Sequence, residues 1–389
     1  MTRVLIVRGH LVTPWELRPW AELPERFDVG VLQTRSNAFD ASSLSLRMVS
    51  VGSLRGRFPR GLLGEVATGV IGDRYTRGAD AAFGDADIVH AEELSFWFAA
   101  DAARRKRRHG FKLVQTVWET LPFLDVYRNR SAKRYRREVL DATDLFLAAT
   151  ERARTALLLE GVEEDRIVVC APGIDVGRFG AASAVAQTEH VVLSPGRLEW
   201  QKGHHDVLRA IALLHRGMVL LPDGSTARPR LRIVGKGPEE ERLRRYASEL
   251  GIAEAVDFGS VPYEEMPSVF ASASCLLLGS QSSASGGYHP FDVPRIFWEE
   301  QFGLVFAEAM AAGLDIITTS NGAIPEVLDG AGTLVAAGDY VGMAEALAAG
   351  PLSRAPGTRV SYPAELLEHY STAAMAGRLA DAYDRVLSV

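Results

Sequence analysis

The strongest constraint on the fold of this chain is a repeated alternation of short apolar runs with longer helical patterns. Strand-like runs rich in β-branched residues occur at residues 3–7, 27–32, 88–90, 112–117, 145–149 and 167–170. Helical patterns, such as that of residues 95–108, separate them. Strands that alternate with helices of this length predict right-handed βαβ units and a parallel sheet.

A second series of the same kind follows a short stretch of turn and linker residues near position 180. Its strands are predicted at residues 190–194, 231–234, 256–258, 275–278 and 316–318, and its helices at 203–214, 238–250 and 266–271. The sequence therefore predicts an α/β protein with two Rossmann-like, doubly wound parallel-sheet domains facing a central cleft. Ligands of such sheets bind outside the carboxyl ends of the strands.

The two series set the predicted domain boundaries in a chain of 389 residues, a length that suits two domains. Residues 1–180 are expected to form the first domain and residues 181–363 the second. Residues 364–389 have helical spacing and are expected to form a helix that packs back on the first domain.

Composition narrows the class and the location of the protein. Apolar residues make up 47% and charged residues 24%, as in a globular protein, and no run of 18 apolar residues predicts a membrane span. The chain starts directly with a strand-like run rather than a signal-peptide pattern. Cys170 and Cys275 lie in apolar runs and are expected to be buried free thiols. We expect a cytoplasmic protein.

The net charge of −6 argues against a nucleic-acid partner, but positive charge gathers in two runs. The first consists of Arg104, Arg105, Lys106, Arg107 and Arg108, and the second of Arg128, Arg130, Lys133, Arg134, Arg136 and Arg137. One interpretation is two solvated helix faces. The other is a basic patch for an anionic membrane surface, which would make the protein peripheral at the inner face of the membrane, or for an anionic acceptor.

Two carboxylates, Glu300 and Glu308, flank a predicted turn at Gly303 and the start of a predicted helix over residues 304–312. A helix start offers free N–H groups and a partial positive charge, which suit a phosphate. Carboxylates beside it could accept hydrogen bonds from sugar hydroxyls. This combination suggests a nucleotide-sugar site, and the alternative is a surface helix with solvated glutamates.

Two cations follow the strand at residues 190–194. Arg197 lies beyond the strand end and Lys202 lies just before the next helix, so both could turn towards a ligand. Arginine offers a planar fork to phosphate oxygens and lysine a point charge. Together they could neutralise the charge that develops on a diphosphate leaving group.

Three segments, at residues 196–203, 233–238 and 300–310, resemble the donor half of a family 4 retaining glycosyltransferase with the GT-B fold. The resemblance is strong over residues 165–335 and looser over the first 160. It implies transfer of a sugar from a nucleotide diphosphate donor to a hydroxyl acceptor, which is a small molecule, a glycan or a lipid-linked sugar. It further implies retention of anomeric configuration, no metal and no cofactor, an acceptor-binding first domain and a donor-binding second domain.

The resemblance also implies roles for individual residues. Arg197 and Lys202 would hold the diphosphate, Glu300 the donor sugar and Glu308 the ribose. Arg197, Lys202 and Glu300 would form the catalytic set. The full donor-binding set would be Gly196, Arg197, Lys202, Val261, Glu300, Gln301, Phe302, Gly303, Leu304 and Glu308.

The acceptor side departs from the family pattern. Such enzymes commonly carry two adjacent glycines after the first strand, where this chain has Gly9 followed by His10. They also commonly carry a histidine where this chain has Trp118 and Glu119. These four residues are the acceptor-side candidates, although Trp118 could instead be a packing aromatic. The segment 281–298 is longer than expected, and we hypothesise that it folds over the donor sugar or the acceptor.

Other functions are also compatible with these sequence features. A sugar-nucleotide epimerase or a phosphorylase could share the two-sheet architecture, and a binding protein could hold a nucleotide sugar without catalysis. A glycosidase could use Glu300 and Glu308 as its carboxylate pair. That last reading is disfavoured because it leaves Arg197 and Lys202 without a role.

Overall fold

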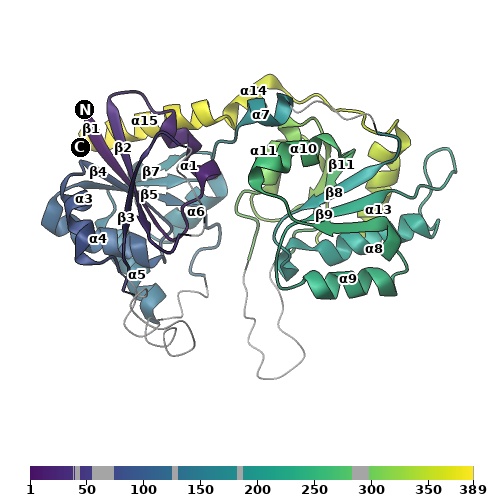
Figure 1. The fold of residues 1–389 in the computed structure, drawn as a ribbon, viewed down its shortest axis with the longest axis horizontal. Coiled ribbons are helices and arrows are strands. Elements are labelled where there is room, and N and C mark those ends of the chain that lie inside the picture. Colours follow the sequence, from purple (N-terminus) through teal and green to yellow (C-terminus); the bar gives the residue numbers. More distant parts are fainter. Residues whose placement is uncertain are drawn as a thin grey trace. The chain divides into compact units, whose positions relative to one another are not determined.

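The computed structural model describes residues 1–37, 39, 44–54, 74–124, 130–181, 187–282 and 298–388. Most of the long segment 281–298 and Arg128 of the second basic run therefore lie outside the described residues. The chain divides into two compact units (Figure 1). Unit 1 combines Met1–Ile174 with Ser371–Val389, and unit 2 is Asp175–Tyr370.

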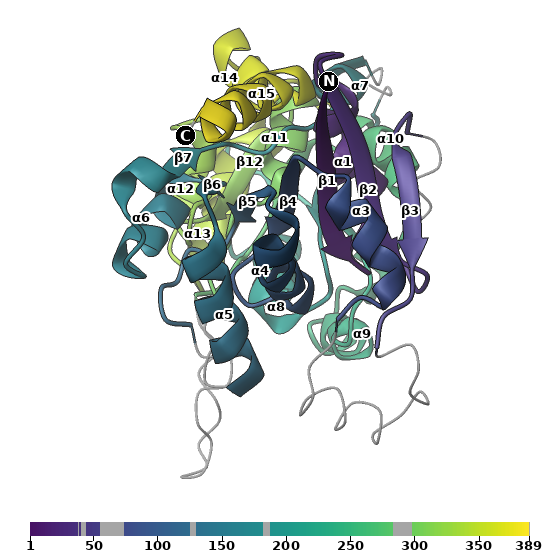
Figure 2. The same ribbon diagram turned by 90° about the vertical axis from the view of Figure 1, so that its left-hand side faces the viewer.

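Unit 1 is built on a seven-stranded sheet with the order β3-β2-β1-β4-β5-β6-β7, in which all neighbouring strands are parallel (Figure 2). Its strands are β1 (Thr2–Gly9), β2 (Phe27–Thr34), β3 (Arg47–Val51), β4 (Ile88–Glu92), β5 (Lys112–Val117), β6 (Leu145–Ala148) and β7 (Ile167–Val169). Its helices are α1 (Pro14–Ala21), α3 (Asp80–Gly84), α4 (Trp97–His109), α5 (Arg130–Ala142), α6 (Glu151–Leu159) and α15 (Thr372–Ser388), with short 3-10 turns at Arg77–Ala79 and Glu164–Arg166.

Both faces of this sheet are buried, which explains why its strands read as continuous apolar runs. Leu5 and Val7 of β1 belong to the core under α3, α4, α5 and α6. Val4 and Ile6 point to the opposite face and join the core formed with α1 and α15. The period of two along β1 thus divides its side chains between two helical layers.

Unit 2 is built on a six-stranded parallel sheet with the order β10-β9-β8-β11-β12-β13. Its strands are β8 (Val191–Pro195), β9 (Arg230–Val234), β10 (Val256–Gly259), β11 (Cys275–Leu277), β12 (Asp315–Thr319) and β13 (Thr333–Val335). Its helices are α7 (Val176–Ala181), α8 (His204–His215), α9 (Glu240–Glu249), α10 (Met266–Ala271), α11 (Leu304–Ala311), α12 (Ile324–Leu328), α13 (Tyr340–Ala349) and α14 (Ala364–His369). Short 3-10 turns occur at Trp200–Lys202, Ala253–Ala255, Tyr263–Glu265 and Pro351–Ser353.

The predicted class of two doubly wound parallel sheets is confirmed, and every predicted strand is present. The sequence pattern does not predict β3 and β13, which are edge strands. Both carry mostly exposed or half-buried residues, so neither shows a continuous apolar run. The expected cleft between the two sheets stays a prediction.

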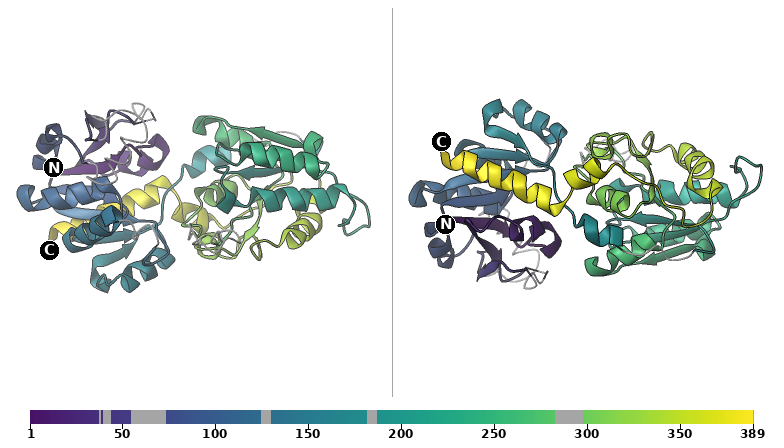
Figure 3. Two further views of the ribbon diagram at one scale, coloured as in Figure 1. Left: turned by 90° about the horizontal axis from the view of Figure 1, so that it is seen from below. Right: turned by 90° about the horizontal axis from the view of Figure 1, so that it is seen from above.

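The C-terminal segment forms two helices instead of the single predicted one. Helix α14 belongs to unit 2, whereas α15 belongs to unit 1 (Figure 3). Ser371 forms a β-bridge with Ile174, and the N–H of Thr372 donates to the Ile174 carbonyl at 3.1 Å, which separates the helices. The observed limits of unit 2, Asp175 and Tyr370, differ from the predicted 181 and 363 for this reason.

The strand orders define where each sheet reverses its winding direction. In unit 1 this point lies between β1 and β4, and in unit 2 it lies between β8 and β11. The loops that leave such neighbouring strands run to opposite faces and leave a crevice at the carboxyl ends, where ligands of open α/β sheets bind. The residues after these four strands are therefore the first candidates for function.

Helix α15 is tied to unit 1 by the buried Tyr383, and this predicts the effect of Tyr383→Phe. The Tyr383 hydroxyl accepts from the Trp20 indole N–H at 2.8 Å and shares a hydrogen bond with His90 Nδ1 at 2.7 Å. Its loss leaves both groups unpaired, so the free energy of unfolding should fall by about 2 kcal/mol in urea denaturation. Asp384→Ala removes only an exposed ion pair with Arg26 and should cost less than about 1 kcal/mol. Equal losses of unfolding free energy in the two variants would contradict the role of the Tyr383 hydroxyl in holding α15.

Candidate functional site

The loop after β8 is shaped by glycines of the neighbouring loop. A Cβ on Gly235 would lie 1.8 Å from the Gly196 carbonyl oxygen, and one on Gly237 would lie 2.3 Å from the Leu198 carbonyl oxygen. The N–H of Leu198 donates to the Lys236 carbonyl at 2.9 Å. The Gly-Lys-Gly sequence is therefore required by the packing of one loop on another.

Lys202 is brought to the end of β11 by an equally close backbone contact. Gly203 has a φ of 67°, and a Cβ on it would lie 1.8 Å from the Gly279 carbonyl oxygen. Lys202 Nζ donates to both carboxylate oxygens of Glu300, at 2.9 and 2.8 Å. The two side chains are 15% and 7% exposed. The structure thus joins two of the three predicted catalytic residues in a buried ion pair.

Three residues that the sequence analysis missed surround this pair. Ser280 Oγ donates to Glu300 Oε2 at 2.9 Å. The N–H of Glu300 donates to Asn321 Oδ1 at 2.7 Å, and Lys202 Nζ lies 4.7 Å from the centre of the Trp298 ring. Ser280 follows β11 and Asn321 follows β12, so polar residues directly after buried strands are the signal that could have found them.

The backbone of Glu300 rests on the turn before α12. The N–H of Ala323 donates to the Glu300 carbonyl at 2.8 Å. Gly322 has a φ of 55°, and a Cβ there would lie 2.2 Å from the same carbonyl oxygen. The position of Glu300 is therefore set by main-chain contacts, which leaves its carboxylate as the part that can respond to a ligand.

Glu308 lies buried in α11, in contact with a tyrosine from the loop after β10. Tyr263 Oη donates to Glu308 Oε1 at 2.7 Å. Burial raises the pKa of Glu308 to about 7, and the Tyr263 hydrogen bond and the charge of Arg178 partly oppose this shift. Gly303, with a φ of 79°, begins the helix that carries Glu308. The sequence pattern does not predict the hydrogen bond between Tyr263 and Glu308.

The other predicted donor residues lie in the same unit without joining the ion pair. Arg197 is 65% exposed, and its Nη1 donates to Glu199 Oε1 at 2.9 Å. Phe302 is buried, with its ring edge-on to Tyr370 at 5.4 Å, so its side chain serves packing. Val261, Gln301 and Leu304 are half-buried. The roles proposed for the backbone at these positions stay predictions.

In unit 1, the acceptor-side candidates lie at the carboxyl ends of β1 and β5. Gly9 is buried, and a Cβ on it would lie 2.6 Å from the Phe98 ring. His10 is exposed and Trp118 half-buried. The indole N–H of Trp118 donates to Glu92 Oε1 at 2.6 Å, so Trp118 is held by a polar contact as well as by packing.

The same end of the sheet contains charged residues that the sequence analysis missed. The buried Arg8 contacts Glu16 at 2.7 Å and Glu92 at 3.3 Å. Glu93 Oε1 accepts from the N–H groups of Trp118 and Glu119 at 2.8 and 3.2 Å. Arg8, Glu92 and Glu93 all lie at strand ends beside the winding reversal, where the apolar pattern stops and charge begins.

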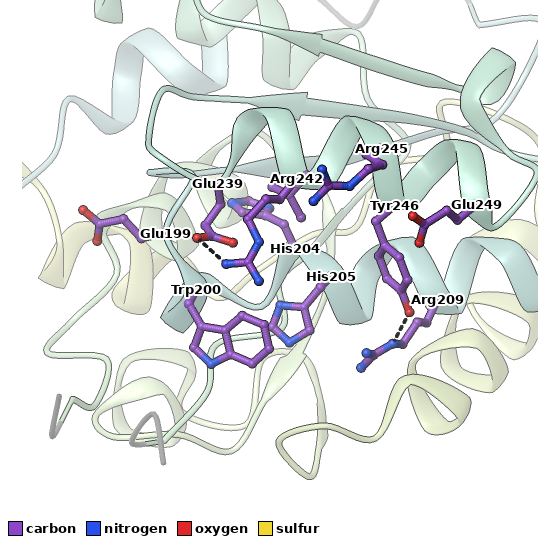
Figure 4. Close-up of a pocket in the computed structure, with 11 residues that line it drawn as sticks. Glu199, Trp200, His204, His205, Arg209, Glu239, Arg242, Arg245, Tyr246 and Glu249 are labelled. Carbon is purple, nitrogen blue, oxygen red and sulfur yellow. Dashed lines mark hydrogen bonds and ion pairs between the residues drawn. The ribbon is translucent and has the colours of Figure 1, made fainter. Parts of the chain in front are cut away.

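A separate cavity of about 240 Å³ lies between α8 and α9 (Figure 4). The Trp200 and His205 rings stack there with centroids 4.0 Å apart, and Arg242 contacts Glu239 at 3.2 Å. Glu199 and Trp200 connect this cavity to the loop of Lys202, but the described residues that line it include none of the predicted donor residues. It is therefore distinct from the Lys202–Glu300 pair.

Two further observations concern the described part of the chain. Within these residues, no group of three or more His, Cys, Asp or Glu side chains is arranged to hold a metal ion. None of the described helices is long and apolar enough to cross a membrane.

Two family models match the chain in succession. The model described as Glycosyltransferase Family 4 matches residues 21–178, and that described as Glycosyl transferases group 1 matches residues 178–349. The fold is also similar to that of the Anabaena protein Alr3699/HepE, solved in complex with UDP-glucose. The TM-score is 0.69 with 15% sequence identity, covering 99% of this chain and 100% of that one. The predicted GT-B architecture is confirmed by these likenesses.

Curated relatives are similar over part of their length. A GDP-mannose-dependent alpha-(1-6)-phosphatidylinositol monomannoside mannosyltransferase of Mycolicibacterium smegmatis is 35% identical over 176 residues, covering 42% of this chain and 41% of the relative. A D-inositol 3-phosphate glycosyltransferase of Corynebacterium jeikeium is 31% identical over 232 residues, covering 54% and 49%. The matched region thus spans less than half the length of either relative.

The close approach of Gly203 to Gly279 predicts that Gly203→Ala is more harmful than its backbone conformation alone explains. Gly217 is a matched control, because its φ of 66° is nearly the same and a Cβ there would meet only Thr226 Cγ2 at 3.3 Å. Gly217→Ala should cost about 1 kcal/mol of unfolding free energy. Gly203→Ala should cost clearly more in the same urea titration, because its Cβ meets backbone. Equal costs would rule out the described contact.

Proposed function

The chain belongs to family 4 of the glycosyltransferases, and on this premise we propose that it transfers a sugar from a nucleotide diphosphate donor to a hydroxyl acceptor. We further propose that transfer retains the anomeric configuration and needs no metal ion. The observation that carries the proposal is the buried Lys202–Glu300 pair at the winding reversal of unit 2. A phosphate-binding cation and a hydroxyl-binding carboxylate already lie together there.

The donor diphosphate competes with Glu300 for the charge of Lys202. Two hydrogen bonds join the pair at low exposure, and the Trp298 ring, with its centre 4.7 Å from Nζ, adds a cation–π contact. When phosphate oxygens take over Lys202, the Glu300 carboxylate becomes able to accept hydrogen bonds from the sugar. Arg197, on the exposed side of the same loop, can add a fork to the phosphate.

Glu308 is the proposed partner of the donor ribose. An ionised carboxylate accepts hydrogen bonds at both oxygens, whereas a protonated one must use a hydrogen for donation. Because burial raises the pKa of Glu308 to about 7, donor binding at neutral pH requires the loss of a proton from part of the molecules. Binding should therefore strengthen as the pH rises through 7.

The proposed reaction takes place on one face of the donor sugar. The bond from the anomeric carbon to the leaving phosphate breaks, the acceptor oxygen bonds to that carbon, and the acceptor proton passes to a leaving-phosphate oxygen. The protein holds the reactants and stabilises the charge on the diphosphate through Lys202 and Arg197. No protein nucleophile takes part in this scheme.

Nucleotide binding provides the first test of the proposed donor site. UDP, GDP, ADP and dTDP are compared in a thermal-shift assay, and we expect at least one to raise the melting temperature. Lys202→Ala should remove most of this shift while the unliganded protein stays folded. If no nucleotide stabilises the protein, the proposal fails.

The pH dependence of nucleotide binding tests the role of Glu308. The dissociation constant of the nucleotide should be roughly tenfold larger at pH 6 than at pH 8, and Glu308→Gln should abolish this difference.

Product analysis tests the reaction itself. UDP-glucose, with which the structural neighbour was solved, and GDP-mannose, on which a relative depends, are incubated with polyol, glycoside and lipid acceptors, and NMR reports the anomeric configuration. We expect the donor's configuration in the product and an unchanged rate in EDTA. Inversion or loss of activity in EDTA would contradict these finer proposals. Free sugar released as an epimer would indicate an epimerase, and nucleotide binding without turnover a binding protein.

We also propose that the basic faces of α4 and α5 contact an anionic membrane surface from the cytoplasmic side. Arg104 and Lys106 are neutralised by Glu138 and Asp144. Arg107, Lys133 and Arg137 are exposed, and no ion-pair partner is found for them within the described residues. Such unneutralised charge on two packed helices suits acidic lipid headgroups.

Vesicle sedimentation checks this membrane contact. We expect the protein to bind phosphatidylglycerol-containing vesicles at low salt and not pure phosphatidylcholine vesicles. The double change Arg107→Glu with Arg137→Glu should abolish binding. A charge-matched control changes the exposed Arg228 and Arg245 of unit 2 to Glu and should leave binding unchanged. An equal effect of both pairs would indicate net charge alone and would contradict a specific surface.

A further inference from the structure

Glu93 follows β4 in an unusual backbone conformation that β5 holds in place. Its φ is 62°, in the left-handed region that residues other than glycine seldom adopt. The N–H of Glu93 donates to the Thr116 carbonyl at 2.8 Å, and Gln115 Nε2 donates to the Glu93 carbonyl at 2.8 Å. Both ends of the residue are thus fixed, and its side chain is directed at the loop that follows β5.

The side chain of Glu93 determines where that loop lies. Glu93 Oε1 accepts from the N–H of Trp118 at 2.8 Å and from that of Glu119 at 3.2 Å. Glu119 Oε1 then accepts from the N–H groups of Thr120 and Leu121, both at 2.9 Å. Four consecutive N–H groups are therefore held by two carboxyl groups, and Glu93 holds the first two.

The ring of Trp118 is held separately from its backbone. Its indole N–H donates to Glu92 Oε1, and Glu92 contacts Arg8, which also contacts Glu16 of α1. Glu92 thus orients the ring, whereas Glu93 places the main chain of Trp118 and Glu119. The adjacent residues Glu92 and Glu93 at the end of β4 thus bind different parts of the loop that follows β5.

The charges around Glu93 favour its uncharged form. Glu119 after β5 and Glu92 in β4 repel a second negative charge, whereas the hydrogen bonds from the N–H groups of Trp118 and Glu119 oppose the shift and favour the ionised form. Arg8 of β1 is shared between Glu92 and Glu16, and His90 of β4 is kept neutral by burial, with a pKa of about 3. Burial first, and then Glu119, raises the pKa of Glu93 to about 8. A proton on Oε2 leaves Oε1 free to accept both N–H groups.

We propose that Glu93 is a positioning residue of the acceptor site, which holds Trp118 and Glu119 where they meet the acceptor. The proposal rests on the proposed transferase function and adds a residue outside the four acceptor-side candidates. Glu93 does so as a neutral acid. Its ionisation places a negative charge beside Glu119 and Glu92, and the loop loosens because this repulsion outweighs the stronger hydrogen bonds that a carboxylate accepts from the two N–H groups.

The first experiment follows tryptophan fluorescence of the unliganded protein from pH 6 to pH 9.5. We expect a transition near pH 8 that is absent in Glu93→Gln, because the amide mimics the neutral acid, and absent in Trp118→Phe. In Glu119→Gln the midpoint should move to lower pH, because one repelling charge is gone. A transition that persists in Glu93→Gln, or that does not depend on Trp118, would overturn the proposal.

The second experiment separates acceptor use from donor binding. With the acceptor found by product analysis, Glu93→Ala should raise the acceptor KM by roughly tenfold or more, while the nucleotide-induced thermal shift stays as in the wild type. Glu93→Gln should restore the acceptor KM at pH 7 and keep its activity at pH 9, where the wild type declines. An unchanged KM in Glu93→Ala, or a Glu93→Gln variant as impaired as Glu93→Ala, would refute the positioning role.

The two experiments distinguish this proposal from the proposed function. If the wild type transfers sugar to no acceptor, the transferase proposal fails, and the fluorescence titration still decides whether Glu93 holds Trp118. If transfer occurs but the titration shows no Glu93-dependent transition, the positioning proposal fails alone.

Discussion

The contact between the backbones of Gly203 and Gly279 is the constraint on which the donor-side site depends. A side chain at either position would force the loop after β8 away from the end of β11. Because both positions are glycine, Lys202 reaches Glu300, 98 positions away in the sequence, and forms an ion pair of low exposure with it. Gly322 adds to this arrangement because it has no side chain and leaves room for the Glu300 carbonyl, which accepts from the N–H of Ala323. The ion pair between Lys202 and Glu300 therefore depends on the packing of these main-chain segments.

The two units place different polar groups at equivalent points of their sheets. In unit 2 the loop after β8 supplies Arg197 and Lys202 beside the winding reversal, which suits an anionic leaving group. In unit 1 the reversal is surrounded by Glu92, Glu93 and Glu119, with the charge of Arg8 already shared. An excess of carboxyl groups suits hydroxyl donors. One architecture, used twice, thus offers different chemistry at each sheet.

The pKa values of two buried acids, one in each unit, are shifted in the same direction. The folded-state pKa values of Glu308, about 7, and Glu93, about 8, both lie above the usual range, because burial disfavours the ionised form. The folded protein therefore holds these protons more tightly than the unfolded chain does. The stability linked to them is full at pH values below the ordinary carboxyl pKa, and it declines as the pH rises through 7 and 8. Function and stability are thus opposed at Glu308, whose ionised form is the proposed ligand-binding form.

The two α/β series, the buried central strands, the helix that carries Glu308 and the family motifs can all be predicted from the amino-acid sequence. These features are local, because apolar periodicity and the positions of glycines depend only on residues that are close together in the sequence. The sequence could not determine the edge strands β3 and β13, whose half-exposed residues lack that periodicity, or the break between α14 and α15, which a bridge from Ser371 to Ile174 imposes. The pairing of Lys202 with Glu300 and the hydrogen bond from Trp118 to Glu93 become visible only in the folded chain. Such contacts join residues that are distant in sequence or turned by an unusual φ, and no local pattern records them.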